Sequence, residues 1–433
     1  MRGSAGTAAG SSDVAGRGQQ QHQANRDLEH LLIVYRSAVT SPPTARVHQP
    51  NRWLMLALSL FAQLAATVFV NSGPALIPNL HFQYGLALSQ AGLIAAAPLA
   101  GTLCTLIIWG AIVDRIGERV SLIIGLSMLA LSAAAAAVSG SLVLLAVFLF
   151  LGGAAGASTN SASGRVVSGW FPPHRRGIAM GIRQAAQPLG VGATALLVPN
   201  LAKAQGLLIT LLAVASICAA AAVLVAALIV DPPRPSKAES RLAGHTDNPY
   251  RGDRRLLRIH GVSIALTVPQ QTAWTFMLVW LIAEQHWSTA AASGLVGGSQ
   301  VCSALARVGA GAWSDRIGSR LRPIRYIALG SAIAMGGLAV LAGTPLAVTF
   351  MVVASIVAVA HNGLAFTAVA EIAGPHWSGR AMGTQNTGQF LTATSVPPVI
   401  GALIAVAGYP AAFAVSGLCA LLAVPVVPVS KRR

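Results

Sequence analysis

Two short stretches concentrate ionisable residues in a chain that otherwise has few of them. "GAIVDRIGERV" begins at Gly110 and contains Asp114 and Arg115, and "GAWSDRIGSRL" begins at Gly311 and repeats the Asp-Arg pair from Asp315. A carboxylate accepts hydrogen bonds from the free N–H groups at a helix start, and arginine forms forked hydrogen bonds with carboxylates. The chemistry predicted for both stretches is therefore reversible ion pairing.

The motifs of covalent and metal chemistry are missing from the sequence. It contains no Gly-rich lysine loop of the phosphate-binding type, no His-Glu-x-x-His pair and no Cys-x-x-Cys pair. The four cysteines stand singly within apolar runs, which is typical of packing residues and implies no disulfide framework. No nucleophile with a neighbouring base is evident either. We therefore expect neither an ATP-driven pump nor an enzyme, and neither a cofactor nor a bound metal.

The elements that position these residues are predicted to be apolar helices. Of 433 residues, 54% are hydrophobic and only 9% are charged, whereas about 25% are charged in a typical soluble protein. A helix needs about 20 apolar residues to cross a bilayer. The apolar runs predict an all-α integral membrane protein with twelve transmembrane helices. Their predicted ranges are 53–75, 89–110, 120–139, 142–165, 177–199, 207–230, 259–283, 289–311, 323–342, 345–371, 380–406 and 409–428.

The basic residues indicate which helix ends face the cytoplasm. Lys and Arg are retained on the cytoplasmic side during insertion, and of the 29 in the chain only Lys203 falls on a predicted outer loop. Both termini are therefore predicted to be cytoplasmic. The net charge of +17 is then explained by topology, so we expect it to meet anionic lipid headgroups and not nucleic acid.

The chain divides into two similar halves. Asp114 and Asp315 are 201 positions apart, and "GIAMGIRQ" from Gly177 matches "GRAMGTQN" from Gly379 at an offset of 202. A nearly constant offset indicates a duplicated six-helix unit. The predicted parts are a disordered cytoplasmic tail (1–50), a first six-helix bundle (51–230), a cytoplasmic linker (231–258), a second six-helix bundle (259–429) and a basic C-terminal tail (430–433).

These features resemble the major facilitator superfamily, in particular its bacterial members with twelve transmembrane helices. The doubled Gly-x-x-x-Asp-Arg-x-Gly pattern is similar to the superfamily's signature after the second helix, and "GWFPPHRRGIAMGI" (169–182) looks like its connection between the fourth and fifth helices. The resemblance implies two pseudo-symmetric six-helix bundles that rock about a central site. It also implies that contacts at the two motifs hold the cytoplasmic side shut, where Glu371 could pair with Arg316; simple anchoring of the topology is the alternative. The implied gating residues are Gly110, Asp114, Arg115, Gly117, Arg119, Gly311, Asp315, Arg316, Gly318 and Glu371.

In this fold the first, fourth, seventh and tenth helices line a central cavity, and the second, fifth, eighth and eleventh flank it. Polar side chains on these helices are costly in hydrocarbon, so their clustering predicts a hydrated substrate site. The substrate-binding candidates are Gln63, Asn71, Asn160, Arg183, Gln184, Gln187, Gln270, Gln271, Trp274, His361, Asn362, Gln385 and Asn386. Thr67, Gln300 and Gln389 lie on the same helices.

Arg183 is the most informative of these residues. It lies about seven residues into the predicted fifth helix, roughly 10 Å deep, and no acidic residue lies at a similar depth. It can serve as the counter-charge of an anionic substrate, or it can extend back to the inner headgroups. His361 is the best titratable candidate in the interior for proton coupling, and a buried neutral histidine is the alternative.

The resemblance therefore predicts a multi-pass secondary transporter of the cell membrane that moves a small organic anion by alternating access, with proton coupling left open. Efflux of drug-like amphipathic compounds is the alternative within the superfamily. Against it, the arginine that drug–proton antiporters carry in the fourth helix is replaced by Phe148, and their fifth-helix Gly-Pro pair by Gln187-Pro188. A non-transporting receptor with the same fold is a further alternative, which the doubled gating motif disfavours. We expect a small-molecule partner and a monomer, the usual state of this fold.

Overall fold

The computed structural model describes residues 50–82, 84–233, 248–251 and 254–428, and every regular element in that part of the chain is a helix. This confirms the all-α prediction for the described residues. The two predicted tails and most of the predicted linker lie outside them. The described helices belong to one compact unit, residues 51–433.

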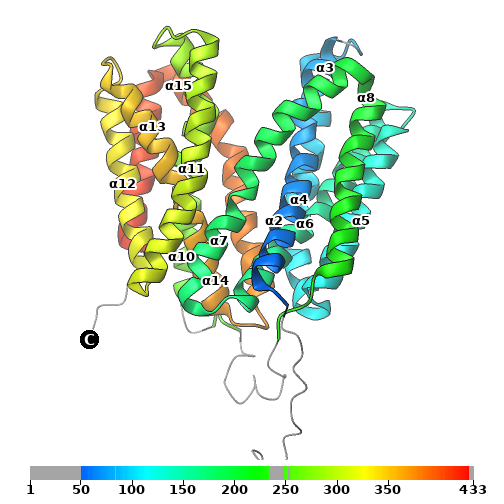
Figure 1. Cartoon of the computed structure of the whole chain (residues 1–433). Helices are drawn as coiled ribbons and strands as arrows, with labels where there is room; N and C mark the ends of the chain where they lie inside the picture. Colours follow the sequence, from blue (N-terminus) through cyan, green and yellow to red (C-terminus); the bar gives the residue numbers. More distant parts are fainter. Residues whose placement is uncertain (1–49, 83, 234–247, 252–253, 429–433) are drawn as a thin grey trace, which may run out of the picture. The chain divides into compact units, whose positions relative to one another are not determined.

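Two sets of helices follow each other along the chain (Figure 1). The first set consists of α2 (Arg52–Ala75), α3 (Ile77–Phe82), α4 (Leu88–Ile116), α5 (Glu118–Ala137), α6 (Leu142–Trp170), a 3-10 turn at Pro173–Arg175, α7 (Arg176–Gln184) and α8 (Ala186–Leu228). The second set consists of α10 (Arg255–Ala283), α11 (Thr289–Ile317), α12 (Leu321–Val340), α13 (Leu346–Val359), α14 (His361–Ala373) and α15 (Ser378–Val426).

Two glycines divide the longest helices. Gly206 in α8 has φ 79° and ψ 178°, and Gly408 in α15 has φ 78° and ψ 174°. Only glycine adopts this backbone region readily, because a Cβ atom would clash there. Figure 1 shows α8 turning back on itself. Each of these helices therefore supplies two of the predicted segments, whereas α13 and α14 together fill a single one, 345–371.

The described helices have the composition of membrane spans. Eight of them are long and apolar enough to cross a membrane, when α7 is joined to α8 and α13 to α14. The helices α10 and α11 are not among the eight, and both carry polar side chains such as Gln270 and Gln300. Apolar side chains also cover the outside: Val340 is 84% exposed and Val406 is 89% exposed, as expected for a surface that faces lipid. The twelve-helix count and the cytoplasmic placement of the termini stay predictions.

Buried apolar side chains hold the helices together. One cluster joins α2, α4, α5, α6 and α8 around Phe69 and Leu126. Another lies within the second set around Trp280 and Phe413. A further cluster contains residues of both sets, among them Met180. The two sets are therefore packed against each other directly, although the predicted boundaries between bundles and linker stay predictions.

Candidate functional site

Asp114, in the first motif, connects α4 to the start of α15. Its Oδ1 accepts the N–H of Gly379 and its Oδ2 accepts the N–H of Arg380, each at 2.9 Å. Arg165 donates to Oδ1 at 2.7 Å and the Arg380 side chain donates to Oδ2 at 3.1 Å. The carboxylate is 1% exposed. Arg165, on α6, also pairs with Glu118 at 3.0 Å. We call these contacts of Asp114 the first latch.

Asp315, in the second motif, makes the matching contacts with the start of α7. It accepts the N–H of Gly177 at 3.0 Å and that of Ile178 at 2.9 Å, and it pairs with Arg320. We call these contacts the second latch. Because Gly177 and Gly379 are the residues that align between the two halves, each motif caps the equivalent helix of the other half. A carboxylate at a helix N-terminus is stabilised by the free N–H groups and by the helix dipole.

The pairing of Glu371 differs from the expectation. Glu371 pairs with Arg320 at 3.2 Å and with Arg176 at 3.7 Å, whereas no pair with Arg316 occurs among the described residues. Successive side chains on a helix point about 100° apart, so Arg316 lies exposed while Asp315 faces α7. Burial lowers the pKa of Arg320, but the hydrogen bonds and charges of Glu371 and Asp315 outweigh the burial and raise it overall. Arg320 therefore stays charged at physiological pH.

The other arginines expected in the first latch do not cross between the sets. Arg115 is exposed. Arg119 is held within the first set, where its N–H donates to Asp231 at 2.7 Å and its guanidinium donates to the Ala226 carbonyl at 2.6 Å. The arginines that do contact Asp114 are Arg165 and Arg380, which sequence reasoning did not assign to the latch.

Glycines allow the two sets to touch at the latches. A Cβ atom on Gly110 would collide with the carbonyl of Gly379, and one on Gly311 would collide with the carbonyl of Gly177. The two remaining motif glycines end helices instead: Gly117 has φ 97° at the end of α4 and Gly318 has φ 60° at the end of α11. We call the close contact between the two sets of helices the seam. It continues along the helices beyond the latches, because Gly181 packs on the backbone of Arg307.

Beyond the latches, the helices of both sets surround a cavity of about 1040 Å³. On α15 the latch residues come first and the lining residues follow from Asn386 to Ala393. The cavity is therefore separated from the latched helix ends by the seam. Ten of the predicted substrate-binding residues border it, from both sets of helices: Gln63, Asn71, Asn160, Gln184, Gln187, Gln270, Gln271, Trp274, Asn362 and Asn386. Thr67, Gln300 and Gln389 border it as well.

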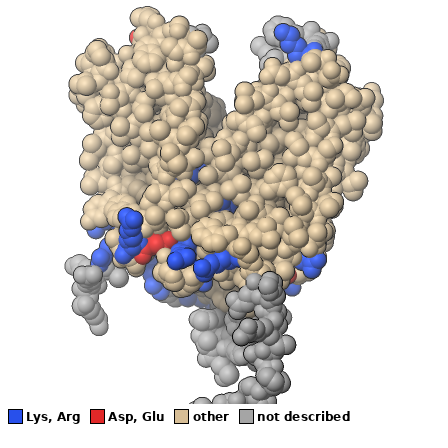
Figure 2. All heavy atoms as spheres, viewed as in Figure 1, with Lys and Arg blue, Asp and Glu red and all other residues tan. Residues whose placement is uncertain are grey.

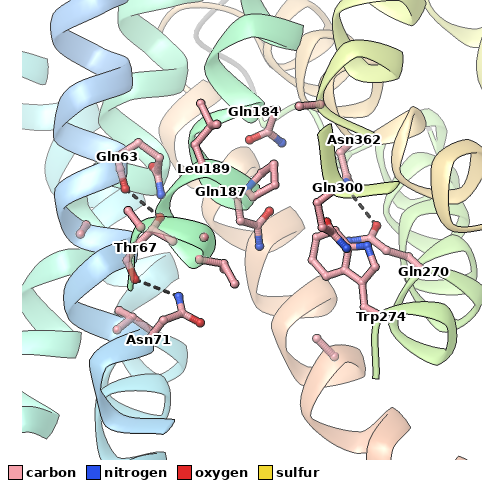
Figure 3. Close-up of a pocket in the computed structure, with 18 of the residues that line it drawn as sticks. Gln63, Thr67, Asn71, Gln184, Gln187, Leu189, Gln270, Trp274, Gln300 and Asn362 are labelled. Carbon is pink, nitrogen blue, oxygen red and sulfur yellow. Dashed lines mark hydrogen bonds between the residues drawn. The ribbon is translucent and has the colours of Figure 1, made fainter. Parts of the chain in front are cut away.

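Figure 3 shows how these side chains are arranged. Gln63, Thr67 and Asn71 lie on one wall, and Gln270 and Trp274 lie on the opposite wall. Side-chain amides are linked within each wall. Gln63 donates to the Asn160 Oδ1 at 3.4 Å in the first set. In the second set Asn362 donates to Gln270 at 3.0 Å and Gln389 donates to Asn362 at 2.9 Å. The amides therefore have fixed orientations.

Arg183 lies directly behind this wall and does not border the cavity. It is 2% exposed and donates to Ser163 at 2.9 Å, to the carbonyl of Asn160 at 2.8 Å and to the Gln184 Oε1 at 3.0 Å. Among the described residues no carboxylate pairs with it. Its side chain is held inside the fold by these bonds and does not extend toward a surface.

His361 and Gln385 do not border the cavity either. His361 is fully buried; its Nδ1 lies 2.7 Å from the carbonyl of Ala358, and its Nε2 has no partner in the described part of the chain. Gln385 is hydrogen-bonded to His260 and Ser263. His260 is in turn 3.0 Å from the hydroxyl of Tyr250. Gln385 thus belongs to a network that leads away from the cavity.

The structure adds residues to the site that sequence reasoning missed. Thr102, Thr267, Phe366 and Phe390 border the cavity, and neither threonine nor phenylalanine stands out in an apolar segment. Arg307 lies within the predicted segment 289–311 and was not among the substrate-binding candidates; its side chain is 1% exposed and lies inside the helices. No group of three or more metal-ligating side chains occurs among the described residues.

Comparisons with known proteins agree on one family. A family model described as Major Facilitator Superfamily matches residues 53–393 and 259–432. An uncharacterized MFS-type transporter of Mycobacterium tuberculosis strain H37Rv is 47% identical over 383 residues, which cover 87% of this chain and 85% of the relative. Its counterpart in strain CDC 1551 matches equally well.

Solved structures share the fold. The transporter FucP in an outward conformation has a TM-score of 0.69 at 17% identity, with 86% of this chain and 97% of FucP covered. The human organic anion transporter MFSD10 has a TM-score of 0.70 at 18% identity, with 88% of this chain and 100% of MFSD10 covered.

Proposed function

The chain belongs to the major facilitator superfamily of transporters, and from this premise we propose that it carries a small organic anion across the cell membrane by alternating access. The observation that carries the anion assignment is Arg183, a buried cation one residue from the cavity wall with no carboxylate partner among the described residues. A guanidinium that lacks a counter-ion favours an anion nearby, because it remains charged when buried.

Residues of the cavity wall connect the Arg183 guanidinium to a solute in the cavity. Asn160 and Gln184 border the cavity and bond to Arg183. A bound carboxylate replaces both of these acceptors, and the amide of Gln63 or of Gln270 donates to one of its two oxygens and orients it. A fork of two parallel N–H···O bonds is the geometry in which arginine holds a carboxylate best. One structural neighbour, MFSD10, is named an organic anion transporter; at its low identity this likeness concerns the fold.

The latches supply the closure that alternating access needs. In the proposed topology twelve segments cross the membrane and the latched ends face the cytoplasm. Lys and Arg gather at the lower end of the described helices in Figure 2, as expected for a cytoplasmic side. In this arrangement the cavity is shut off from the cytoplasm. Breaking both latches and opening the seam turns the same cavity to the other side. Two copies of the latch favour a transporter over a receptor, which needs no such closure.

Efflux of amphipathic compounds is the second candidate function. Trp274, Phe366 and Phe390 border the cavity, and aromatic faces of this kind stack on flat apolar ligands. In this case Arg183 is a structural residue that holds Ser163 and Asn160 in place, and neutral compounds are carried as well as anions.

Counterflow in proteoliposomes tests the proposal. Liposomes preloaded with an unlabelled solute are diluted into labelled solute, and a carrier exchanges the two. We expect Arg183→Gln to slow the exchange of anions by about tenfold or more, the value of a charge-assisted hydrogen bond, and to leave neutral solutes of similar size unaffected. Arg325→Gln, which removes an exposed arginine of α12, is the matched control. Equal loss for neutral and anionic solutes contradicts the charge role of Arg183.

A further inference from the structure

Arg307 is a second buried cation that the anion proposal does not use. It lies on α11 and is 1% exposed. Its Nη1 donates to the backbone carbonyl of Gln184 at 2.6 Å, but Nε and Nη2 find no acceptor among the described residues. No carboxylate pairs with it in the same part of the chain. Buried N–H groups of a charged side chain are costly to leave unpaired, so these two donors require an explanation.

The unpaired donors lie behind the cavity wall at Trp274. The centre of the Arg307 guanidinium is 5.7 Å from the centroid of the Trp274 ring, which is the distance of a cation–π contact. Trp274 borders the cavity, and its own Nε1 is buried without an acceptor. Figure 3 shows the indole beside Gln300 and Gln270. Three donor nitrogens, one in the wall and two behind it, therefore lack acceptors in the part of the chain that the structure describes.

Gln184 links the Arg307 guanidinium to Arg183. The side-chain oxygen of Gln184 accepts from Arg183 at 3.0 Å, and its backbone oxygen accepts from Arg307 at 2.6 Å. Gln184 itself borders the cavity. The two guanidiniums thus flank one wall residue, one from α7 in the first half of the chain and one from α11 in the second. Together they place two positive charges beside the cavity, and the described residues supply neither with a carboxylate.

We propose that the substrate is a dianion held between Arg183 and Arg307. This inference rests on the proposed function and narrows its substrate class to small molecules with two negative charges, carried by two carboxylates or by one phosphate. The second anionic group displaces the Trp274 indole from the Arg307 guanidinium and accepts from Nη2 and Nε. Since the two arginines come from different halves, a dianion contacts both halves at once and a monoanion contacts only one.

Binding to the purified transporter tests the charge requirement. The probes are butanoate, succinate and inorganic phosphate at constant ionic strength and pH 7.5, and the readouts are the melting temperature and the tryptophan fluorescence. We expect wild type to bind succinate or phosphate at least about tenfold more tightly than butanoate, since the second group gains charge-assisted hydrogen bonds. We also expect the dianion to change the fluorescence, and Trp274→Phe to remove most of that change. Comparison of succinate with phosphate then distinguishes the two chemical sources.

Variants separate this inference from the anion proposal. Arg307→Gln should remove the preference for the dianion over butanoate, Arg307→Lys should retain part of that preference, and Arg325→Gln should alter neither the preference nor butanoate binding. Equal affinity of wild type for butanoate and succinate overturns the inference even if Arg307→Gln fails to fold. A dianion preference that survives Arg307→Gln overturns it as well. In either case, exchange of monoanions that depends on Arg183 leaves the proposed function standing.

Discussion

At the scale of single residues, Asp114 joins more of the structure than any other carboxylate described here. Its two oxygens receive donors from α6 and from the first turn of α15. Removal of one partner from a buried ion pair costs about 3–5 kcal/mol, because the remaining charge is left unpaired. The latch is therefore sensitive to a change of one atom.

We expect Asp114→Asn to slow solute exchange by at least about tenfold while ligand binding survives, since Arg165 and Arg380 lose their shared partner. Exchange rates in proteoliposomes and the ligand-induced rise in melting temperature measure the two effects. Asp231→Asn is the control, because Asp231 bonds to Arg119 within the first set of helices. Unchanged turnover of Asp114→Asn would remove this residue from the gate.

His361 offers a separate test of proton coupling. The side chain is fully buried and its Nε2 has no partner among the described residues. If its protonation drives transport, His361→Gln should flatten the dependence of uptake on an imposed proton gradient while exchange without a gradient continues. Uptake is measured in proteoliposomes with and without the gradient. A dependence that persists in the variant shows that His361 is not the coupling group.

Sequence reasoning found the amide residues of the cavity and missed Arg307. Glutamine and asparagine stand out in apolar segments because their side chains are costly in hydrocarbon, and ten of the predicted substrate-binding residues do border one cavity. Arg307 stands ten positions before the end of α11 and inside the predicted segment 289–311, and the count of basic residues assigned it to the cytoplasmic side. Whether an arginine turns inward or toward a loop depends on contacts such as that with Gln184, which the sequence does not contain.

At the scale of helices, the apolar runs predicted the cores of the segments well and their inner ends poorly. The predicted segment 89–110 is α4 to Ile116, and the predicted segment 142–165 is α6 to Trp170. The helix α4 continues past the predicted end through Asp114 and Arg115, and α6 continues for five residues beyond Arg165. Asp114 lies in the extension of α4, and Arg165 is the last residue of the predicted segment in α6. The two side chains pair with each other, which stabilises these polar helix ends.

The glycine contacts between helices are expected to control how closely the inner end can shut. Gly311→Ala places a methyl group against the backbone of Gly177 and 2.9 Å from the Ile178 nitrogen. We expect this overpacking to cost about 1–3 kcal/mol in the latched state and to raise the labelling rate of a cysteine introduced at the inner seam. Gly309→Ala lies on the same helix with nothing within 4 Å, and it should leave both quantities unchanged or slightly raise stability. Identical behaviour of the two variants would show that the close contact is not needed for closure.

At the scale of the whole molecule, the duplication was readable in the sequence, but the residue pairs that close one end of the cavity were not. The offsets between the halves predicted that two motifs would behave alike, and both do cap a helix of the opposite half. Which end of the cavity is closed depends on pairs such as Asp114 with Gly379, which are 265 positions apart. Local patterns do not report contacts of this range.

The proposed topology predicts the side on which each terminus lies. Reporter domains that fluoresce only in the cytoplasm should be active when fused after Arg433, and a reporter inserted beside Lys203 should be inactive, since basic residues are retained inside. Fluorescence of intact cells measures both fusions, and protein levels on blots serve as the control. An active reporter at Lys203 would reverse the assignment of inner and outer ends.

The short helix α7 connects events at its two ends. It has nine residues, about 13 Å of helix, with the Asp315 contact at its start and Arg183 and Gln184 at its finish. A helix of this length moves as a rigid body, so a substrate that displaces Arg183 also displaces Gly177 at the other end of α7. It follows that a compound wedged beneath the 3-10 turn at Pro173–Arg175 would immobilise the carrier without competing for its cargo, and inhibitors of this protein should therefore exist in two kinetically distinct kinds.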